Sequence, residues 1–516
     1  MENPPADEVR AQESVFAFLT DSMKHPDIRR IDTHAASVFL EGGRALKIKR
    51  AVRFPFLDYS TLAKRKAACD EELRINQPFA PQIYRRVVAI TRSSDGSLRV
   101  DGNGTPVEFA VEMTRFDERQ TVDRLAEAGP LDPGLADAIA DAIAASHKVA
   151  HRAPEKPWVD SIAGLIEGYT IAFRDAACFP LDDIEELGTA SQAACSRLRG
   201  MLEQRGRQGH VRRCHGDLHL ANVALIEGKP VLFDAIEFDD RIASIDVLYD
   251  LAFPLMDFLR YGREPSANTL FNRYLAVTPS DNLDALEALP LFMSMRAAIR
   301  AHVMLSRSSA DKARNIEIAR AYFDLARLLI HPPRPTLTAI GGLSGTGKSV
   351  LARGLAPVVA PQPGAVVLRS DVLRKQLFGV SITDRLPASA YQPEVSEQVY
   401  QELTRQAVRV LSQGHSVVAD AVFAHEAERA AIQKAARGMN VRFIGFFLVA
   451  DLATRQGRVG SRKADASDAT PEVAGLQETY SIGSLDWAII DASGTPEATL
   501  RHCQTRIADP GPIEAV

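Results

Sequence analysis

The chain has 516 residues, of which 46% are hydrophobic and 25% charged, and its formal net charge is -5. This length suggests roughly two to four domains, and the composition excludes a disordered or membrane-embedded protein. The slightly acidic balance argues against a large nucleic-acid-binding surface, which normally carries a basic excess, so nucleic acid is not expected as a partner.

Three further features concern the compartment in which the protein works. The five cysteines form no CxxC pair, which excludes a disulfide framework and a CxxC zinc motif and predicts free thiols in a reducing compartment. Residues Met1–Pro5 lack the basic-then-apolar order of a signal peptide. The longest apolar run, Phe443–Ala450, is far shorter than the ~20 residues of a membrane span. We therefore expect a cytoplasmic protein with no membrane partner.

The first part of the chain begins with patterns of β-strands. Two strands are predicted on either side of a turn at Gly42-Gly43, a helix follows them, and three more strands come after turn signals. In chain order, these elements are Ser37–Leu40, Arg44–Lys49, Thr61–Asn76, Tyr84–Thr91, Leu98–Asp101 and Val107–Thr114. From about Asp132 onward the pattern is mostly helical. A small β-rich part followed by a larger helical part predicts two lobes with a cleft between them.

A polar loop in the helical part carries the pattern H-G-D-x-x-x-x-N, from His215 to Asn222, with Asp217 at its third position. Asp234 follows 12 residues after Asn222, at the end of the apolar stretch Val231–Phe233. With these residues the chain resembles the aminoglycoside phosphotransferase and choline kinase superfamily, which are relatives of protein kinases. The resemblance implies that Asp217 accepts the proton of an attacking hydroxyl, while Asn222 and Asp234 hold Mg²⁺ against the phosphates of ATP.

The same resemblance assigns roles to residues nearer the N-terminus. Lys47, in the strand Arg44–Lys49, is the candidate for the lysine that contacts the nucleotide, and Glu72 on the next helix is its candidate partner. Their neighbours are rival assignments, Lys49 for the lysine and Glu71 for the carboxylate. Two aspartates, Asp246 and Asp250, resemble the structural motif of the family and are interpreted as architectural.

The resemblance extends to the strand that joins the lobes and has two departures. Glu108–Thr114 resembles the joining strand, where backbone groups, including those near Met113, would meet adenine. The hairpin that starts at Thr33 lacks the glycine-rich loop of protein kinases. Asp234 is followed by Ala235-Ile236-Glu237 rather than by Phe-Gly, so a different local turn is expected there.

A proline-rich connector, His331–Pro335, follows a predicted helix over Ala313–Ile330. Three prolines in four positions cannot continue a helix and favour an extended, stiff linker. We place the domain boundary there, which gives domains 1–330 and 336–516. The second of them alternates predicted strands and helices from Leu337 to Val449, which is typical of a parallel sheet covered by helices.

The second domain opens with a phosphate-binding loop. Residues Gly342–Ser349 fit G-x-x-x-x-G-K-[ST] at every fixed position, between a predicted strand and a predicted helix. In this motif the backbone N–H groups of the loop cradle phosphate, the lysine contacts the outer phosphates and the final hydroxyl binds Mg²⁺. The nucleotide-contacting residues are therefore predicted to be Gly342, Ser344, Gly345, Thr346, Gly347, Lys348 and Ser349. Asp420, at the end of the strand Ser416–Asp420, is predicted to orient the metal, although a turn or helix cap would also suit it.

The residues after the second strand of this domain resemble P-loop small-molecule kinases, a group that includes gluconate kinase, shikimate kinase, zeta-toxin-like kinases and polynucleotide 5′-kinases. The resemblance implies that Asp371 holds or deprotonates the acceptor hydroxyl and that Arg374 steadies the substrate. Asp371 also suits a helix N-cap. Arg455, Arg458 and Arg462 resemble the arginine-bearing lid that stabilises the transferred phosphoryl group, although they also fit a solvated basic helix face.

Across nearly its whole length, with the stretch Phe54–Thr61 as a further signature, the chain resembles a bacterial fusion of these two kinase types. The implied fold is an α+β two-lobed protein-kinase-like domain followed by an α/β P-loop kinase domain with a parallel sheet. The implied function is a bifunctional ATP- and Mg²⁺-dependent kinase acting on a small-molecule hydroxyl. Two alternatives stay open, a regulatory nucleotide-sensing protein with one active kinase domain and a polynucleotide 5′-hydroxyl kinase in the second domain. The patterns leave the acceptor and the oligomeric state undetermined.

Overall fold

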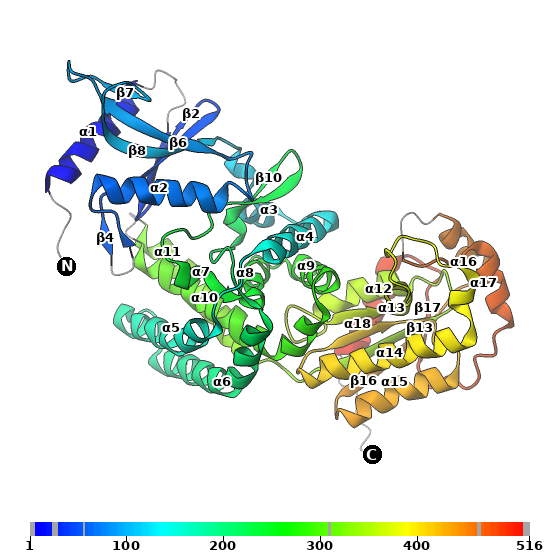
Figure 1. Ribbon diagram of the computed structural model, residues 1–516. Coiled ribbons are helices and arrows are strands. Elements are labelled where there is room, and N and C mark those ends of the chain that lie inside the picture. Colours follow the sequence, from blue (N-terminus) through cyan, green and yellow to red (C-terminus); the bar gives the residue numbers. More distant parts are fainter. Residues whose placement is uncertain (1–5, 23–28, 55–56, 308–310, 462–465, 509–516) are drawn as a thin grey trace. The chain divides into compact units, whose positions relative to one another are not determined.

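The computed structural model describes residues 6–22, 29–54, 57–307, 311–461 and 466–508 (Figure 1). The chain divides into two compact units. The first unit comprises Met1–Gly168 and Arg199–Asp257, and the second comprises Tyr169–Leu198 and Phe258–Val516.

The border between the units crosses three helices rather than the proline-rich connector. These helices are α5 (Glu155–Ala176), α6 (Leu181–Gln208) and α8 (Val247–Arg260). The connector at 331–335 lies inside the second unit, so the domain boundary placed there from the sequence stays a prediction.

The first unit contains a six-stranded antiparallel sheet of order β1-β2-β3-β8-β6-β7. Its strands are β1 (Arg29–Asp32), β2 (Ala36–Glu41), β3 (Arg44–Lys49), β6 (Tyr84–Arg92), β7 (Leu98–Val100) and β8 (Thr105–Thr114). Helix α2 (Leu62–Asn76) packs against β8. The strands and the helix predicted for this region are confirmed.

Helix α1 (Ala6–Ser22) also packs against β8, although the sequence analysis did not predict it. It buries Val15, Phe16 and Leu19 against sheet residues such as Phe39.

Two pairs of short strands flank the polar loop His215–Asn222. Strand β9 (Val211–Arg213) precedes the loop and pairs with β12 (Ser244–Asp246). Strands β10 (Val223–Ile226) and β11 (Lys229–Leu232) form an antiparallel hairpin after it. This hairpin begins directly after Asn222 and ends two residues before Asp234, so it sets the spacing of the two predicted metal ligands.

The second unit contains a five-stranded parallel sheet of order β14-β15-β13-β16-β17. Its strands are β13 (Thr336–Gly342), β14 (Val366–Arg369), β15 (Val417–Asp420), β16 (Arg442–Val449) and β17 (Ala488–Asp491). The parallel sheet that the alternating pattern predicted is confirmed, whereas β17 was not predicted. The carboxyl ends of β13, β14 and β15 carry the phosphate-binding loop, Asp371 and Asp420, which is the edge where ligands bind in open α/β sheets.

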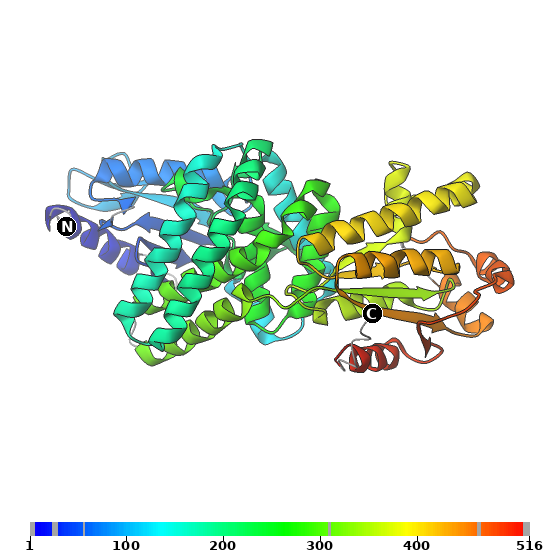
Figure 2. The same cartoon turned by 90° about the horizontal axis from the view of Figure 1, so that it is seen from below.

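Helices cover both faces of this sheet. Helices α12 (Lys348–Leu355) and α18 (Pro496–Ala508) pack on one face, where Leu351 and Cys503 share a core with strand residues such as Phe446. Helices α14 (Pro393–Ser412) and α15 (Glu426–Gly438) pack together against the other face. In Figure 2, α14 in yellow and α18 in red lie on opposite sides of the sheet.

The second unit also contains α9 (Glu264–Val277), α10 (Leu289–Ser306) and α11 (Lys312–Ile330). The predicted helix over Ala313–Ile330 is confirmed as α11. Within the described ranges, no helix combines the length and apolar character that a membrane crossing requires.

Candidate active sites

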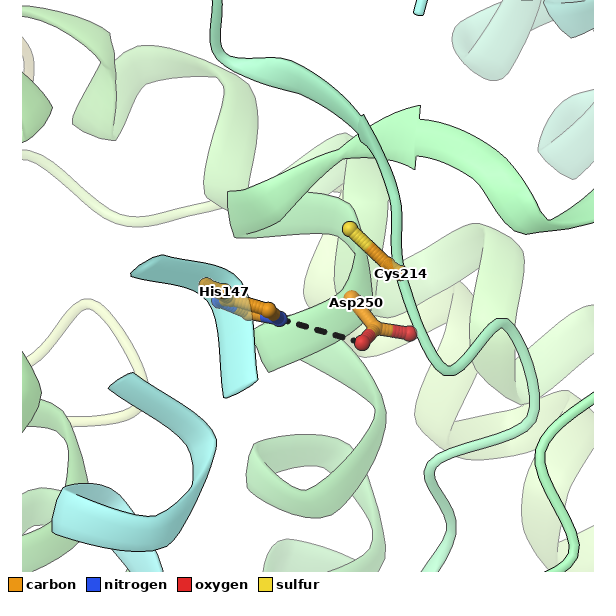
Figure 3. A group of neighbouring side chains, drawn as sticks. All are labelled: His147, Cys214 and Asp250. Atoms are coloured by element: carbon orange, nitrogen blue, oxygen red, sulfur yellow. Dashed lines mark hydrogen bonds and ion pairs between the residues drawn. The ribbon is translucent and has the colours of Figure 1, made fainter. Parts of the chain in front are cut away.

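The polar loop of the first unit is held in place by Asp250 at its base. The side chain of Asp250 is buried and accepts hydrogen bonds from the backbone N–H groups of His215, at 3.3 Å, and Gly216, at 3.0 Å. Gly216 has a φ of 83°, which a residue with a Cβ rarely adopts. His147 Nε2 lies 3.1 Å from Asp250 Oδ2, and Figure 3 shows this contact together with the nearby Cys214. The group is a buried hydrogen-bond network that fixes the loop, as the architectural interpretation of Asp250 predicted.

Asp217 and Asn222 meet within this loop. The Asn222 side-chain amide donates to the Asp217 backbone carbonyl at 2.9 Å and lies 3.4 Å from its carboxylate oxygen Oδ2. The Asp217 side chain is 43% exposed, so a substrate could approach it. The Phe233 N–H donates to the Asn222 carbonyl at 3.0 Å, which ties the loop to the residue before Asp234.

A network of charged side chains connects strand β3, helix α2 and the segment after β11, which are far apart in the sequence. Lys47 Nζ lies 2.7 Å from a Glu72 carboxylate oxygen and 2.5 Å from Asp234 Oδ1. Burial lowers the pKa of Lys47, but the charges of Asp234 and Glu72 outweigh that effect and hold the pKa well above its usual value. Burial raises the pKa of Asp234, yet Lys47 reverses this, so the net pKa of Asp234 is lowered. Burial also raises the pKa of Glu72, and the charges of the two neighbouring lysines outweigh that effect and lower it. All three groups are therefore charged near neutral pH.

The rival residues take different positions. Lys49 Nζ lies 2.7 Å from the other Glu72 oxygen and also pairs with Glu237. Glu71 pairs instead with Arg74 at the helix surface. The structure thus brings Lys47, Glu72 and Asp234 together, and it places Lys49 beside them as a second cation. The nucleotide-binding role of these residues stays a prediction.

A cavity of about 500 Å³ opens beside this network. Its lining includes Lys47, Met113, Asp217 and Asp234, whereas Glu72 is fully buried behind Lys47. The volume lies within the range of small-molecule pockets in proteins. Met113, at the end of β8, therefore lies on the same cavity as the predicted catalytic and metal-binding carboxylates.

In the second unit, the segment from Gly342 to Ser349 forms a tight loop between β13 and α12. Gly345 and Gly347 have φ values of 90° and 94°, and a Cβ on Gly345 would lie 2.4 Å from the Arg455 carbonyl oxygen. Lys348 Nζ lies 3.1 Å from the Leu343 carbonyl oxygen, so its ammonium is folded back over the loop. The remaining predicted contacts, Gly342, Ser344 and Thr346, belong to the same loop.

The predicted metal ligands of this loop lie in contact with each other. The Ser349 hydroxyl donates to Asp420 Oδ2 at 2.5 Å. Arg369, the last residue of β14, lies 3.3 Å from the same oxygen and donates to the Ser349 hydroxyl at 3.1 Å. Sequence reasoning did not select Arg369 as a site residue. Arg369 lies at the carboxyl end of β14 beside Asp420, and such a position in a parallel sheet indicates a site residue.

Asp371 lies near this cluster at the start of α13 (Ser370–Leu377). Burial raises its pKa, the negative charge of Asp420 adds to that effect, and Lys348 and Arg369 only partly oppose it. The Ser467 hydroxyl also hydrogen-bonds to its carboxylate. A carboxylate with a raised pKa suits a proton acceptor better than an ordinary surface aspartate does.

The predicted arginines are mostly bonded to backbone carbonyls. Arg374 is buried and donates to the Ala390 carbonyl at 2.6 Å. Arg458 donates at 2.8 Å to the carbonyls of both Ala492 and Gly494. These contacts hold loops in place, and the predicted catalytic roles of Arg374 and Arg458 stay predictions.

Arg455 and Arg462 complete the predicted set of arginines. Arg455 is buried, lies 3.5 Å from the Ser344 carbonyl oxygen of the phosphate-binding loop, and pairs with Glu478. Arg462 lies outside the described residues. A second cavity, of about 260 Å³, is lined by Arg458 and by Gly345, Thr346 and Gly347 of the loop.

Two family models match separate parts of the chain. The model described as "Phosphotransferase enzyme family" matches residues 32–289, which is half of the chain. The chain belongs to the phosphotransferase enzyme family. The model described as "AAA domain" matches residues 337–479 of this phosphotransferase. Together the two matches confirm the fusion that the sequence resembles, and they identify the protein as an ATP-dependent kinase.

Related proteins and structures span one or both parts of the phosphotransferase. It is 29% identical over 492 residues to "Uncharacterized protein Rv2004c" of Mycobacterium tuberculosis, which covers 92% of this chain and 94% of the relative. A gluconokinase from Sinorhizobium meliloti covers 34% of this chain and 94% of its own, with 18% identity and a TM-score of 0.25. A choline kinase from Cryptosporidium parvum covers 61% of this chain and 95% of its own, with 10% identity and a TM-score of 0.38.

Proposed function

We propose that this phosphotransferase is bifunctional and that each of its two sites transfers phosphate from MgATP to a hydroxyl group of a small molecule. One observation supports this most directly. In each unit the chain gathers a lysine, carboxylates and an amide or hydroxyl group around its own cavity or loop, and these are the groups that phosphoryl transfer requires.

At the first site, the proposal gives each residue a separate task. Asp217 accepts the proton of the acceptor hydroxyl, because its carboxylate is partly exposed and an acceptor can reach it. Lys47 contacts the nucleotide phosphates and is oriented by Glu72. Asn222 and Asp234 supply the oxygens that would hold Mg²⁺, and carbonyl and carboxylate oxygens are the ligands this ion prefers. Bound Mg²⁺ would neutralise charge on the transferred phosphoryl group.

At the second site, the backbone N–H groups of the loop and Lys348 bind the phosphates. Ser349 and Asp420 would hold Mg²⁺, since their side chains already meet at 2.5 Å. Asp371 accepts the proton of the acceptor hydroxyl, and Arg455 lies behind the loop where it can steady phosphoryl charge. The proposal retains the cytoplasmic location that the sparse cysteines predict.

The acceptor class is tested by an unbiased screen of the full-length chain. Sugars, amino-sugars, alcohols and nucleosides are incubated with MgATP, and phosphorylated products are identified by mass spectrometry. We expect at least two acceptors, one lost in Asp217→Asn and the other in Lys348→Ala. ATP binding without turnover of any acceptor would favour the regulatory alternative. Labelling of a 5′-hydroxyl oligonucleotide would favour the polynucleotide kinase alternative.

The pH dependence of the second site follows from the raised pKa of Asp371. A proton acceptor works in its ionised form, so activity is complete above its pKa and falls as the pH drops through it. Because the pKa of Asp371 is raised above 3.8, we expect the acidic limb of kcat/KM to lie above the ordinary range of aspartate. The measurement is a pH profile of P-loop turnover. If the residual activity of Asp371→Asn showed the same acidic limb as the wild type, Asp371 would not be the proton acceptor.

Glu72 offers a test that separates it from its rival Glu71. Replacing Glu72 by glutamine removes the buried charge shared by Lys47 and Lys49, although each lysine keeps one other carboxylate. We expect the free energy of unfolding of the first unit to fall by about 2 kcal/mol. We also expect ATP affinity, measured in a Lys348→Ala background, to decrease at least about tenfold.

The matched control is Glu71→Gln on the adjacent helical position. Glu71 pairs only at the surface, so we expect its replacement to change unfolding by less than about 0.5 kcal/mol. Urea titration and calorimetric nucleotide binding check both variants. Equal effects of the two substitutions would refute the assignment of Glu72.

A further inference from the structure

Strand β14 forms one edge of the parallel sheet in the second unit. Its inner side pairs with β15, for example through the Val366 N–H, which donates to the Ser416 carbonyl at 2.9 Å. The N–H and C=O groups of its neighbouring residues point to the opposite, outer side, because successive residues of a strand alternate. An edge strand needs a partner or a cover for these groups.

Helix α9 supplies that cover through the side chain of Asn272. The Val367 N–H donates to Asn272 Oδ1 at 2.8 Å, and Asn272 Nδ2 donates to the Ala365 carbonyl at 3.1 Å. A carboxamide carries the same donor and acceptor as a peptide group. Asn272 therefore offers the outer side of β14 the pair of hydrogen bonds that another strand would offer.

Asn268, one helical turn earlier, completes this arrangement. Its Nδ2 donates to the carbonyls of Pro363 and Ala365, both at 3.1 Å. Asn272 Nδ2 lies 3.1 Å from Asn268 Oδ1, which fixes the orientation of the second amide relative to the first. The two asparagines thus form a short hydrogen-bonded ladder along the start of β14. We call this pair the asparagine clamp.

The surroundings of the asparagine clamp are closely packed. A Cβ on Gly364 would lie 2.7 Å from Asn268 Nδ2, and this glycine has a φ of 100°. The buried ring of His415 lies with its centroid 5.2 Å from that of Phe271 on α9, and its Nε2 is 2.9 Å from the Gly364 carbonyl oxygen. The segment Ser280–Ala288 contacts α9, and its Asp284 forms two contacts of 2.5 Å with Arg409 on α14. These neighbours hold α9 and the sheet edge in one arrangement.

The strand that the clamp holds leads directly to the P-loop site. Arg369 lies two residues after Val367 and contacts both Ser349 and Asp420, and Asp371 follows it on α13. We propose that Asn272, supported by Asn268, is a positioning residue for phosphoryl transfer at the P-loop site. The position of β14 sets where Arg369 and Asp371 lie. This inference rests on the proposed function of that site.

The clamp has a consequence for how the two matched regions depend on each other. Helix α9 lies within residues 32–289, which match the phosphotransferase family, whereas β14 lies within the region that matches the AAA domain. The first region therefore contributes part of the framework of the second active site. Because α9 holds β14, the P-loop site depends on residues outside 337–479, the region that matches the AAA domain.

The test compares two substitutions of Asn272 in the full-length chain. Asn272→Leu has a similar size but removes both hydrogen bonds to β14 and the contact with Asn268. Asn272→Asp keeps the acceptor for Val367 while placing a carboxylate against the Ala365 carbonyl. Hydrogen–deuterium exchange of a peptide covering 365–371 is the first measurement. We expect exchange at least about tenfold faster in Asn272→Leu and an intermediate increase in Asn272→Asp, because local opening loses two hydrogen bonds. Exchange at the wild-type rate in both variants would overturn the proposal.

The second measurement separates positioning from general loss of stability. We expect kcat for transfer at the P-loop site, or for ATP hydrolysis there, to fall at least about tenfold in Asn272→Leu, because small displacements of reacting groups are costly. ATP affinity should change less than about twofold, since the loop lies on β13. Asn282→Leu is the matched control, because Asn282 is buried in the same unit and donates to Thr278 instead. An equal loss of kcat in the control would overturn the positioning role. The exchange measurement needs no turnover, so it tests whether Asn272 holds β14 separately from the proposed activity.

Discussion

Replacing Lys348 by alanine is expected to lower turnover at the P-loop site by about 10²–10³-fold while the first site keeps its activity. The expectation follows from where the ammonium lies. Lys348 Nζ is 3.1 Å from the Leu343 carbonyl oxygen, so its charge is already aimed over the loop that would receive the phosphates. Removing one such preorganised group typically costs that much in phosphoryl or acyl transfer.

The substitution should leave the fold intact. The loop also holds its shape through the Thr346 hydroxyl, which donates to the Leu343 carbonyl at 2.8 Å, and through the Ser344 N–H, which donates to Gln477 at 2.7 Å. Initial rates with the acceptors found by the screen check the result. Lys434→Ala on α15 is the control, because Lys434 is an exposed lysine of the same unit. Unchanged turnover of every acceptor in Lys348→Ala would remove the P-loop from the proposed mechanism.

The phosphate-binding loop was predictable because its information is local. All its fixed positions lie between Gly342 and Ser349, and the flanking strand and helix are visible in the same stretch of sequence. Periodicity also predicted the parallel sheet, which places Asp420 beside Ile340 of β13. Strand order and register then bring Asp420 to Ser349 without any further signal in the sequence.

The charge network of the first site was predictable only through resemblance to a family. Lys47 is separated from Glu72 by 25 residues and from Asp234 by 187, so no local pattern links them. The choice between neighbours such as Glu72 and Glu71 depended on which face of α2 turns inward. The helix is weakly amphipathic, and its buried side includes charged residues such as Arg65 as well as Glu72, so the usual apolar stripe gave little guidance.

Other features were beyond the reach of sequence patterns. Asn272 and Asn268 look like ordinary polar residues on a helix, and their role appears only when α9 lies along the edge of β14. Arg374 fits the motif after the second strand, yet its donors meet the Ala390 carbonyl and Ser396. A motif specifies residue types and spacing, whereas tertiary packing decides which donor reaches which acceptor.

Replacing Asp217 by asparagine is expected to lower turnover at the first site by about 10²–10⁴-fold, the usual contribution of a positioned general base. Asparagine has the same shape but cannot take the proton of the acceptor hydroxyl. The loop should keep its form, because Asp250 fixes it through the N–H groups of His215 and Gly216, and Asn222 bonds to the backbone carbonyl of residue 217. The residues proposed to contact and orient the nucleotide phosphates are Lys47 and Glu72 rather than Asp217, so ATP affinity should stay within about twofold.

The readout that separates proton transfer from positioning is the effect on kcat against the effect on nucleotide binding. Calorimetric titration with ATP in a Lys348→Ala background isolates the first site, and initial rates with its acceptor give kcat. Asp70→Asn on α2 is the matched control, since Asp70 is half exposed and pairs with Lys66 at the surface. A base is needed only in the transition state, so the loss must appear in kcat and not in ATP affinity. If Asp217→Asn turned over acceptor at the wild-type rate, another group would have to accept the proton, and the cavity that holds Lys47, Met113 and Asp234 would need a different catalytic residue.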